Sequence, residues 1–202
     1  MNHTDNRTGI APDNPKALIF SRFEDHDICP YNIKAFRVIN SKAAMSTLYK
    51  TEGRDNYALT YVLEGSFTYY FNETSFRSDD SSGNDVQTIE CRAGEMTFLP
   101  VGAVYHHENK APASMYVLYF SIAPDIPSEY RPSVPVLLKT GDSKRFGRLF
   151  EDTFNKYMST KRSALDVKSS LCSLLSALAA EEELGRHDKG AGVGSSWSLA
   201  AC

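Results

Sequence analysis

The sequence lacks several features that mark large classes of proteins. No apolar run in the 202 residues approaches the roughly 18 residues that a transmembrane helix requires. Its first residues, 1–7, are polar and contain no apolar core of a secretory signal peptide. The formal net charge of -3 leaves no basic excess of the kind that nucleic-acid-binding domains show. We therefore predict a cytoplasmic protein with no membrane partner.

Motifs of common catalytic chemistry are also missing. There is no Gly-x-Ser-x-Gly nucleophile motif and no glycine loop of the phosphate-binding type. The cysteines are far apart and form no Cys-x-x-Cys pair, which excludes a zinc ribbon and a disulfide scaffold. They are Cys29, Cys91, Cys172 and Cys202. We predict reduced thiols, no catalytic residues and a protein that is not an enzyme.

Histidine is scarce where a metal centre would need it. No histidine lies between His26 and His106. His106 and His107 are adjacent, so in a strand their side chains point to opposite faces. Imidazole and carboxylate groups form a metal site when three or four converge on one point. The prediction is therefore no metal and no cofactor.

Alternating strands and tight turns dominate the first two thirds of the sequence. The segment Tyr57–Gly65 (YALTYVLEG) has a period of two, is rich in aromatic and β-branched residues, and ends at a glycine suited to a turn. Met96–Leu99 is stopped by Pro100 and turned by Gly102. Turn signals recur about every 8–12 residues, which predicts an antiparallel barrel or sandwich. The other expected strands are 32–39, 45–49, 66–71, 86–90 and 113–122.

The period changes to a helical one after about residue 142. Phe146, Phe150 and Phe154 belong to one apolar stripe. A second helix, 164–184, has a coiled-coil-like seam that predicts a homodimer interface. Its residues are Val167, Leu171, Leu174 and Leu178. Glu181–Glu183 falls in the last predicted turn, where negative charge opposes the helix dipole, so this helix either continues or frays there.

The resulting organisation has four parts and a mainly β fold with C-terminal α-helices. We expect a flexible arm (1–16), a ligand-binding barrel (17–135), a helical dimerisation segment (136–184) and a disordered tail (185–202).

The order of these motifs resembles a known family. Arg54, Tyr57–Gly65, Gly94–Gly102 (GEMTFLPVG) and the pair His106 and His107 follow one another as in the N-terminal sensor domain of AraC-type bacterial transcription regulators. The two glycine-bounded segments are similar to the two sequence motifs of cupins. The resemblance covers residues 17–184 and implies a cupin-like jelly-roll barrel that binds a small effector, followed by two dimerising helices. The family binds DNA through helix-turn-helix motifs, and no segment after Leu184 predicts one.

The candidate site lies at the barrel mouth. An arginine can bind a carboxylate or sugar hydroxyls with its fork of donors, tyrosines can stack on a ring, and a histidine can make a polar contact. We therefore expect the effector to be a sugar or a small organic acid. The candidate ligand-binding residues are Arg54, Tyr57, Tyr61, Tyr105, His106 and His107.

Two alternatives stay open at this point. A small cupin isomerase or dioxygenase would contain a stoichiometric metal, and a purely structural dimerising module would contain no cavity.

Overall fold

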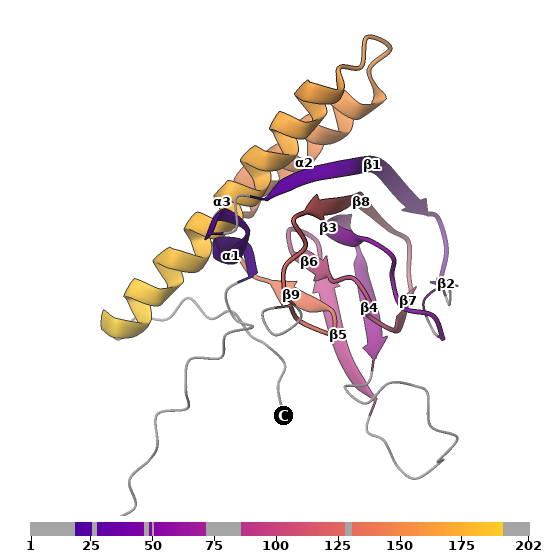
Figure 1. The fold of residues 1–202 in the computed structure, drawn as a ribbon. Coiled ribbons are helices and arrows are strands. Elements are labelled where there is room, and N and C mark those ends of the chain that lie inside the picture. The colour runs from indigo at the N-terminus through magenta and orange to yellow at the C-terminus, as the bar shows by residue number, and fades with distance from the viewer. Residues whose placement is uncertain are drawn as a thin grey trace, which may run out of the picture.

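The strands of this protein form two antiparallel sheets that face each other. The structure is a computed structural model that describes residues 19–25, 28–46, 49, 51–71, 86–127 and 131–191, with side chains as far as residue 184 (Figure 1). One sheet has the order β1 (Cys29–Asn40), β8 (Ala113–Ala123), β3 (Tyr57–Glu64), β6 (Met96–Leu99) and β9 (Val136–Leu138). The other has the order β2 (Ala44–Ser46), β7 (Tyr105–Asn109), β4 (Ser66–Phe71) and β5 (Gln87–Arg92). The predicted mainly β, jelly-roll fold is confirmed.

Three helices cover the outer face of the five-stranded sheet. They are α1 (Ile19–Asp25), α2 (Ser143–Met158) and α3 (Ala164–Ala191). Figure 1 shows α2 and α3 running side by side past β1, with α1 against α3. The N-cap of α2 is Asp142, whose Oδ1 accepts a hydrogen bond from the backbone N–H of Arg145 at 2.9 Å. Neither long helix has an apolar stretch of the length needed to cross a bilayer, within the residues described.

The central strand β3 is buried on both faces. Tyr57, Leu59 and Tyr61 belong to one apolar cluster, and the alternate residues Ala58 and Val62 belong to another. This division follows from the period of two in a strand. β3 therefore separates two compartments.

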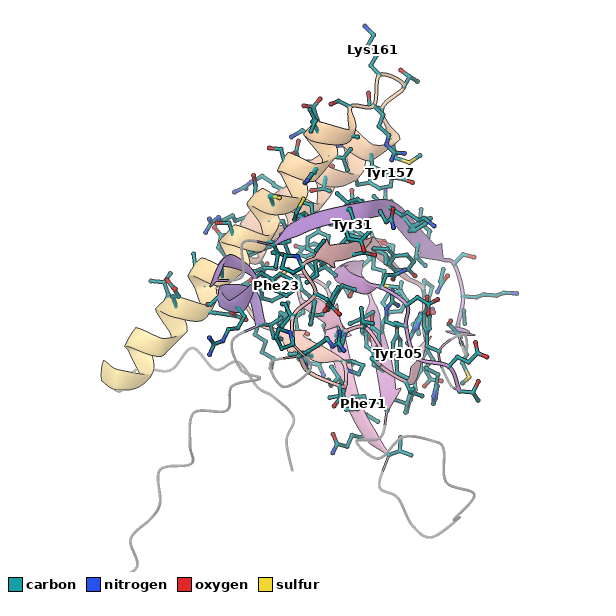
Figure 2. The ribbon with its side chains drawn as sticks, viewed as in Figure 1. Phe23, Tyr31, Phe71, Tyr105, Tyr157 and Lys161 are labelled. Atoms are coloured by element: carbon teal, nitrogen blue, oxygen red, sulfur yellow. The ribbon has the colours of Figure 1, made fainter. Side chains whose placement is uncertain are left out.

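We call these two compartments the helix-side core and the barrel interior. The helix-side core lies between the five-stranded sheet and the helices and contains, among others, Phe20, Phe23, Tyr57, Leu59, Phe98, Phe120, Phe146, Phe150, Leu171 and Leu174. The barrel interior lies between the two sheets and contains, among others, Ala58, Val62, Phe67, Tyr69, Phe71, Leu99, Tyr105, Met115 and Val117. In Figure 2 Tyr105 lies among the side chains between the sheets, whereas Phe23 projects from α1.

A buried carboxylate joins α1 to α3. Glu182 Oε1 accepts a hydrogen bond from the N–H of Ile19 at 3.0 Å, and its Oε2 accepts from the N–H groups of Phe20 and Ser21, both at 2.9 Å. The Ser21 hydroxyl donates to Oε2 as well, at 3.2 Å. The first N–H groups of a helix have no partner within it, so Glu182 caps α1 from a distant part of the chain.

The structure differs from the expected segment boundaries in three places. Residues 136–138, assigned to the helical segment, form β9 and pair with β6. A helix, α1, stands at the start of the segment assigned to the barrel, and α3 continues past residue 184 to Ala191. The predicted arm (1–16) and most of the predicted tail (192–202) lie outside the described residues.

Candidate functional site in the barrel interior

A cavity of about 320 Å³ lies within the barrel between the two sheets. Seven strands and the two loop residues before β3 supply its wall. Its lining residues are Val38, Asn40, Ala44, Met45, Ser46, Tyr49, Arg54, Thr60, Tyr69, Leu99, Tyr105, His107, Asn109, Met115, Val117 and Tyr119. Met45, which is 60% exposed, belongs to this wall, so the cavity reaches the surface beside β2.

Backbone hydrogen bonds hold Arg54 at the wall of the cavity. Its N–H donates to the carbonyl of Ala103 at 3.2 Å, and its carbonyl accepts from the N–H of Gly102 at 2.8 Å. The preceding Gly53 approaches this turn so closely that a Cβ atom there would lie 2.5 Å from the Gly102 carbonyl oxygen. The two glycine-containing loops therefore fix where the Arg54 side chain begins.

The Arg54 side chain is almost completely buried, with 2% of its surface exposed. Its Nη1 donates to the Tyr105 hydroxyl at 2.6 Å, while Nε and Nη2 donate to the backbone and side-chain oxygens of Asn56 at 3.1 and 2.9 Å. The guanidinium carbon lies 4.5 Å from the ring centre of Tyr49 and 4.7 Å from that of Tyr119. Cation–π contacts at these distances stabilise a desolvated guanidinium.

The other titratable groups of the cavity wall are neutral at pH 7. Burial, the charge of Arg54 and the neighbouring His106 lower the pKa of His107 to about 4. Burial raises the pKa of the Tyr49, Tyr69 and Tyr105 phenols. The wall therefore presents one positive charge surrounded by neutral phenols, an imidazole and apolar side chains.

The mouth of the cavity contains an amide pair. Asn40 Nδ2 donates to Asn109 Oδ1 at 2.7 Å, and Asn109 Nδ2 donates to the carbonyls of Lys42 and Ala111 at 2.9 and 2.7 Å. These bonds tie β1 to the β7–β8 turn beside the opening, so the amides support the mouth rather than project freely into it.

Three of the six residues predicted to bind a ligand lie on this wall. They are Arg54, Tyr105 and His107. The structure places the other three outside this wall. Tyr57 and Tyr61 point to the helix side of β3, where their hydroxyls donate to Asp125 Oδ1 at 2.9 Å and to the carbonyl of Ser143 at 3.0 Å. His106 points outward from β7 and stacks on Tyr70 with ring centres 4.7 Å apart.

The sequence patterns did not single out several cavity residues. Tyr49, Thr60, Tyr69 and Tyr119 line the cavity. For Tyr69 the signal is strand phase: β7 contributes Tyr105 and His107 from one face, and the neighbouring strand β4 pairs Tyr69 with His107.

The part of the chain that the structure describes contains no cluster of metal-ligating side chains. Within the described residues, no three His, Cys, Asp or Glu side chains lie close enough together to hold an ion. His106 and His107 point to opposite faces, as adjacent strand residues do.

The four residues predicted to form the dimer interface are buried inside their own chain. Val167 is 2% exposed, and Leu171, Leu174 and Leu178 are fully buried. The structure places this apolar stripe against the protein's own sheet and helices rather than on the surface of α3. The outward face of α3 contains instead Leu165, Ser169, Ser173, Ala180 and Leu184.

A second hollow lies on the outer surface. It measures about 810 Å³ and is bordered by the start of β1 and the start of α3. Its charged residues Lys34, Asp55 and Arg162 are exposed to solvent. The barrel cavity is the stronger candidate site because its polar groups converge in a desolvated space.

Comparisons with known proteins find similarity in structure only. No family model and no curated protein sequence matches this chain. Among solved structures, apo ToxT from Vibrio cholerae, an AraC-family regulator, superimposes with a TM-score of 0.49 at 12% identity, over 76% of this chain and 58% of ToxT. ToxT from Vibrio cholerae O395 gives a TM-score of 0.45 at 9% identity, over 73% of this chain and 54% of ToxT.

Cupin proteins also match part of this chain. A cupin-2 domain protein from Shewanella frigidimarina gives a TM-score of 0.30 at 20% identity, over 43% of this chain and 69% of that protein. Oxalate decarboxylase from Bacillus subtilis gives 0.33 at 12% identity, over 45% of this chain and 21% of the enzyme. Because these TM-scores are low, the fold assignment rests on the strand order and register of this chain.

Proposed function

We propose that this chain is the effector-binding and dimerisation domain of an AraC-type transcription regulator. The observation that carries the proposal is the cavity between the sheets, with a buried arginine, a tyrosine hydroxyl and a neutral imidazole on its wall. Convergent polar groups in an otherwise apolar pocket are typical of small-molecule sites. The order of motifs from Arg54 to His107 supports the regulator family.

The wall of the cavity suits binding better than catalysis. Its single imidazole, His107, lies beside Tyr69 and Tyr105 with ring centres 5.5 and 6.3 Å away. Metal chemistry needs several imidazole or carboxylate ligands that converge on one point, and the residues lining this cavity include one histidine and no Asp or Glu. We therefore propose that the domain is not an enzyme.

β3 provides a physical route from the effector to the helices. Thr60 faces the cavity, and the next residue, Tyr61, donates a hydrogen bond to the Ser143 carbonyl at the start of α2. An effector that favours one position of β3 would favour one position of α2. Such a shift in population requires different affinities of the effector for the two arrangements.

Dimerisation is proposed to use the outward face of α3. Leu165 and Leu184 are 77% and 62% exposed near the two ends of this face, with small residues between them. The test is the mass in solution by light scattering of the Leu165→Glu/Leu184→Glu double variant. Met158→Glu, at an exposed position at the end of α2, is the matched control.

The expected result is a dimer for wild type and control and a monomer for the double variant. A monomeric wild type at tens of micromolar would refute dimerisation, and a dimeric double variant would refute this face. DNA binding is proposed to belong to a helix-turn-helix part separate from residues 17–184.

The effector site is tested by filling the cavity. Val117 lies on the wall and is 4% exposed, so Val117→Phe should occupy the space of a ligand. Thermal-shift and calorimetric titrations with small sugars and organic acids should give hits for wild type that Val117→Phe loses. Ile39→Phe adds similar bulk at a position that is 67% exposed and should keep them. Hits that survive in a folded Val117→Phe variant would place the ligand elsewhere.

A further inference from the structure

We infer that the effector carries a carboxylate on a small apolar or aromatic body, and that the Arg54 guanidinium binds this carboxylate. The inference rests on the proposed function, because it names the ligand class of the same cavity. Four observations carry it: an unbalanced buried charge, free donors on that charge, the character of the wall, and the size of the space.

The first observation is the missing counter-ion. Arg54 is 2% exposed, yet the ion pairs found among the described residues do not include it. Its partners are the Tyr105 hydroxyl, the two oxygens of Asn56 and two aromatic rings, which are all neutral. Burying an unpaired charge is costly, and proteins usually pair buried charges. An anionic ligand would supply the pairing that the chain itself does not.

The second observation is that Arg54 has donors to spare. A guanidinium has five N–H groups, and Nε, Nη1 and Nη2 each donate one hydrogen bond within the protein. Among the described residues, no hydrogen-bond partner is found for one N–H on Nη1 and one on Nη2. Two such donors on neighbouring nitrogens match the two oxygens of a carboxylate.

The third observation is that the wall suits a flat or apolar body better than a sugar. Leu99, Met115 and Val117 supply apolar surface, and Tyr49 and Tyr119 supply rings. A sugar needs acceptors for its many hydroxyls, which carboxylate side chains commonly provide. No Asp or Glu is among the residues that line the cavity, and its amides at Asn40 and Asn109 bond to each other and to the backbone.

The fourth observation is the volume. About 320 Å³ is at the lower end of the range of ligand pockets, which runs from roughly 300 to 1,000 Å³. The ligand is therefore a small monocarboxylate rather than a large or multiply charged anion.

Matched pairs of probes test the inference without any substitution. Calorimetric titration of the wild-type chain would compare benzoate with benzamide, phenylacetate with phenylacetamide, and hexanoate with hexanamide at pH 7. Each pair has nearly the same shape and differs in charge. We expect at least one carboxylate to bind at least tenfold more tightly than its amide, and Val117→Phe to lose that binding.

Two arginine variants then locate the charge. Arg54→Met should abolish the preference for carboxylate over amide, and Arg54→Lys should retain part of it because a cation remains. The matched control is Arg92→Met, which removes one positive charge from an exposed side chain on β5. Circular dichroism and a melting temperature establish that each variant is folded.

The outcomes separate this inference from the proposed function. If amides or sugars bind as well as carboxylates, and Val117→Phe loses them, the cavity is an effector site and the carboxylate inference is wrong. If none of these probes or sugars binds to the wild type, both are wrong. If the preference for carboxylate persists in Arg54→Met, the anion binds somewhere other than Arg54.

Discussion

The two compartments on either side of β3 are built differently. The helix-side core contains aromatic and aliphatic side chains from the sheet and all three helices. Its buried carboxylate, Glu182, accepts four hydrogen bonds from residues of α1. The barrel interior encloses a cavity of about 320 Å³ and a buried cation without a carboxylate partner. The helix-side core also borders a hollow of about 300 Å³, beside Phe20, Phe23 and Leu175, but no charged side chain is among the residues that line it, whereas Arg54 lines the barrel cavity.

The largest expected difference comes from the same substitution in each compartment. Leu59 faces the helix-side core, and Leu99, on the neighbouring strand, faces the cavity. Truncation in a well-packed core leaves a new void, so Leu59→Ala should lower the free energy of unfolding by about 4 kcal/mol and Leu99→Ala by about 2 kcal/mol. Urea denaturation measures both. Equal losses would show that the barrel interior is packed as tightly as the helix-side core.

A second difference between the compartments is how their contributions to stability depend on pH, beginning with the helix-side core. Burial raises the pKa of Glu182 to about 7, although the N–H groups of Ser21, Phe20 and Ile19 oppose the shift. A carboxyl with a raised pKa adds stability that is complete below its ordinary value of 4.5 and is lost as the pH rises through about 7. The contribution is at most about 1.4 kcal/mol per pH unit.

The measurement is the free energy of unfolding across this range for wild type and Glu182→Gln. The difference between the two curves should fall steadily from pH 4.5 to 7. If the difference between the two free energies of unfolding does not vary with pH, the Glu182 carboxyl has an ordinary pKa in the folded protein. Glu183→Gln, at the exposed neighbouring position, is the control and should leave the wild-type curve unchanged.

The barrel interior should respond to pH in the opposite direction. Because the pKa of His107 is lowered to about 4, its contribution is present above the ordinary value of 6.5 and is lost as the pH falls through about 4. Wild-type stability should therefore change little between pH 4.5 and 6.5, where the two groups oppose each other. His107→Gln should leave only the trend of Glu182. If the stability of His107→Gln is as independent of pH in this range as that of wild type, His107 is not the group that opposes Glu182.

The smallest expected change in stability belongs to Arg54. Replacing Arg54 by an apolar chain of similar length removes the cost of burying an unpaired charge, which offsets the loss of its hydrogen bonds to Tyr105 and Asn56. Arg54→Met should change the free energy of unfolding by less than about 1 kcal/mol while carboxylate binding is lost. Thermal and urea denaturation without ligand measure this. A loss of several kcal/mol would make Arg54 a structural residue of the barrel.

Strand positions could be predicted from the sequence more readily than strand faces. The alternation in Tyr57–Gly65 located β3, but both of its faces are buried, so the pattern did not say which face is the interior. The tyrosines at positions 57 and 61 were assigned to the wrong compartment for this reason. Arg54 and Tyr105 could be found because each adjoins a glycine- or proline-containing turn that positions it.

Contacts between distant segments could not be predicted. The seven residues of α1 are too few for a clear helical period, and their cap comes from Glu182, more than 160 positions later. The local pattern of Glu181–Glu183 is unfavourable for a helix end because negative charge there opposes the helix dipole. The pattern does not reveal that Glu182 caps α1, a helix far away in the sequence. The apolar spacing of α3 predicted a buried stripe correctly but could not identify its partner as the protein's own core.

The double burial of β3 also limits how a signal can travel. A slip of one residue along its neighbours would exchange the two faces of the strand and move Tyr61 into the cavity and Thr60 among the helices. The hydrogen-bond ladders to β6 and β8 on both sides would have to break at once for this to happen. Any motion that β3 transmits is therefore a small tilt or translation of an intact sheet, so effector-dependent change should appear as coordinated shifts on both flanking strands.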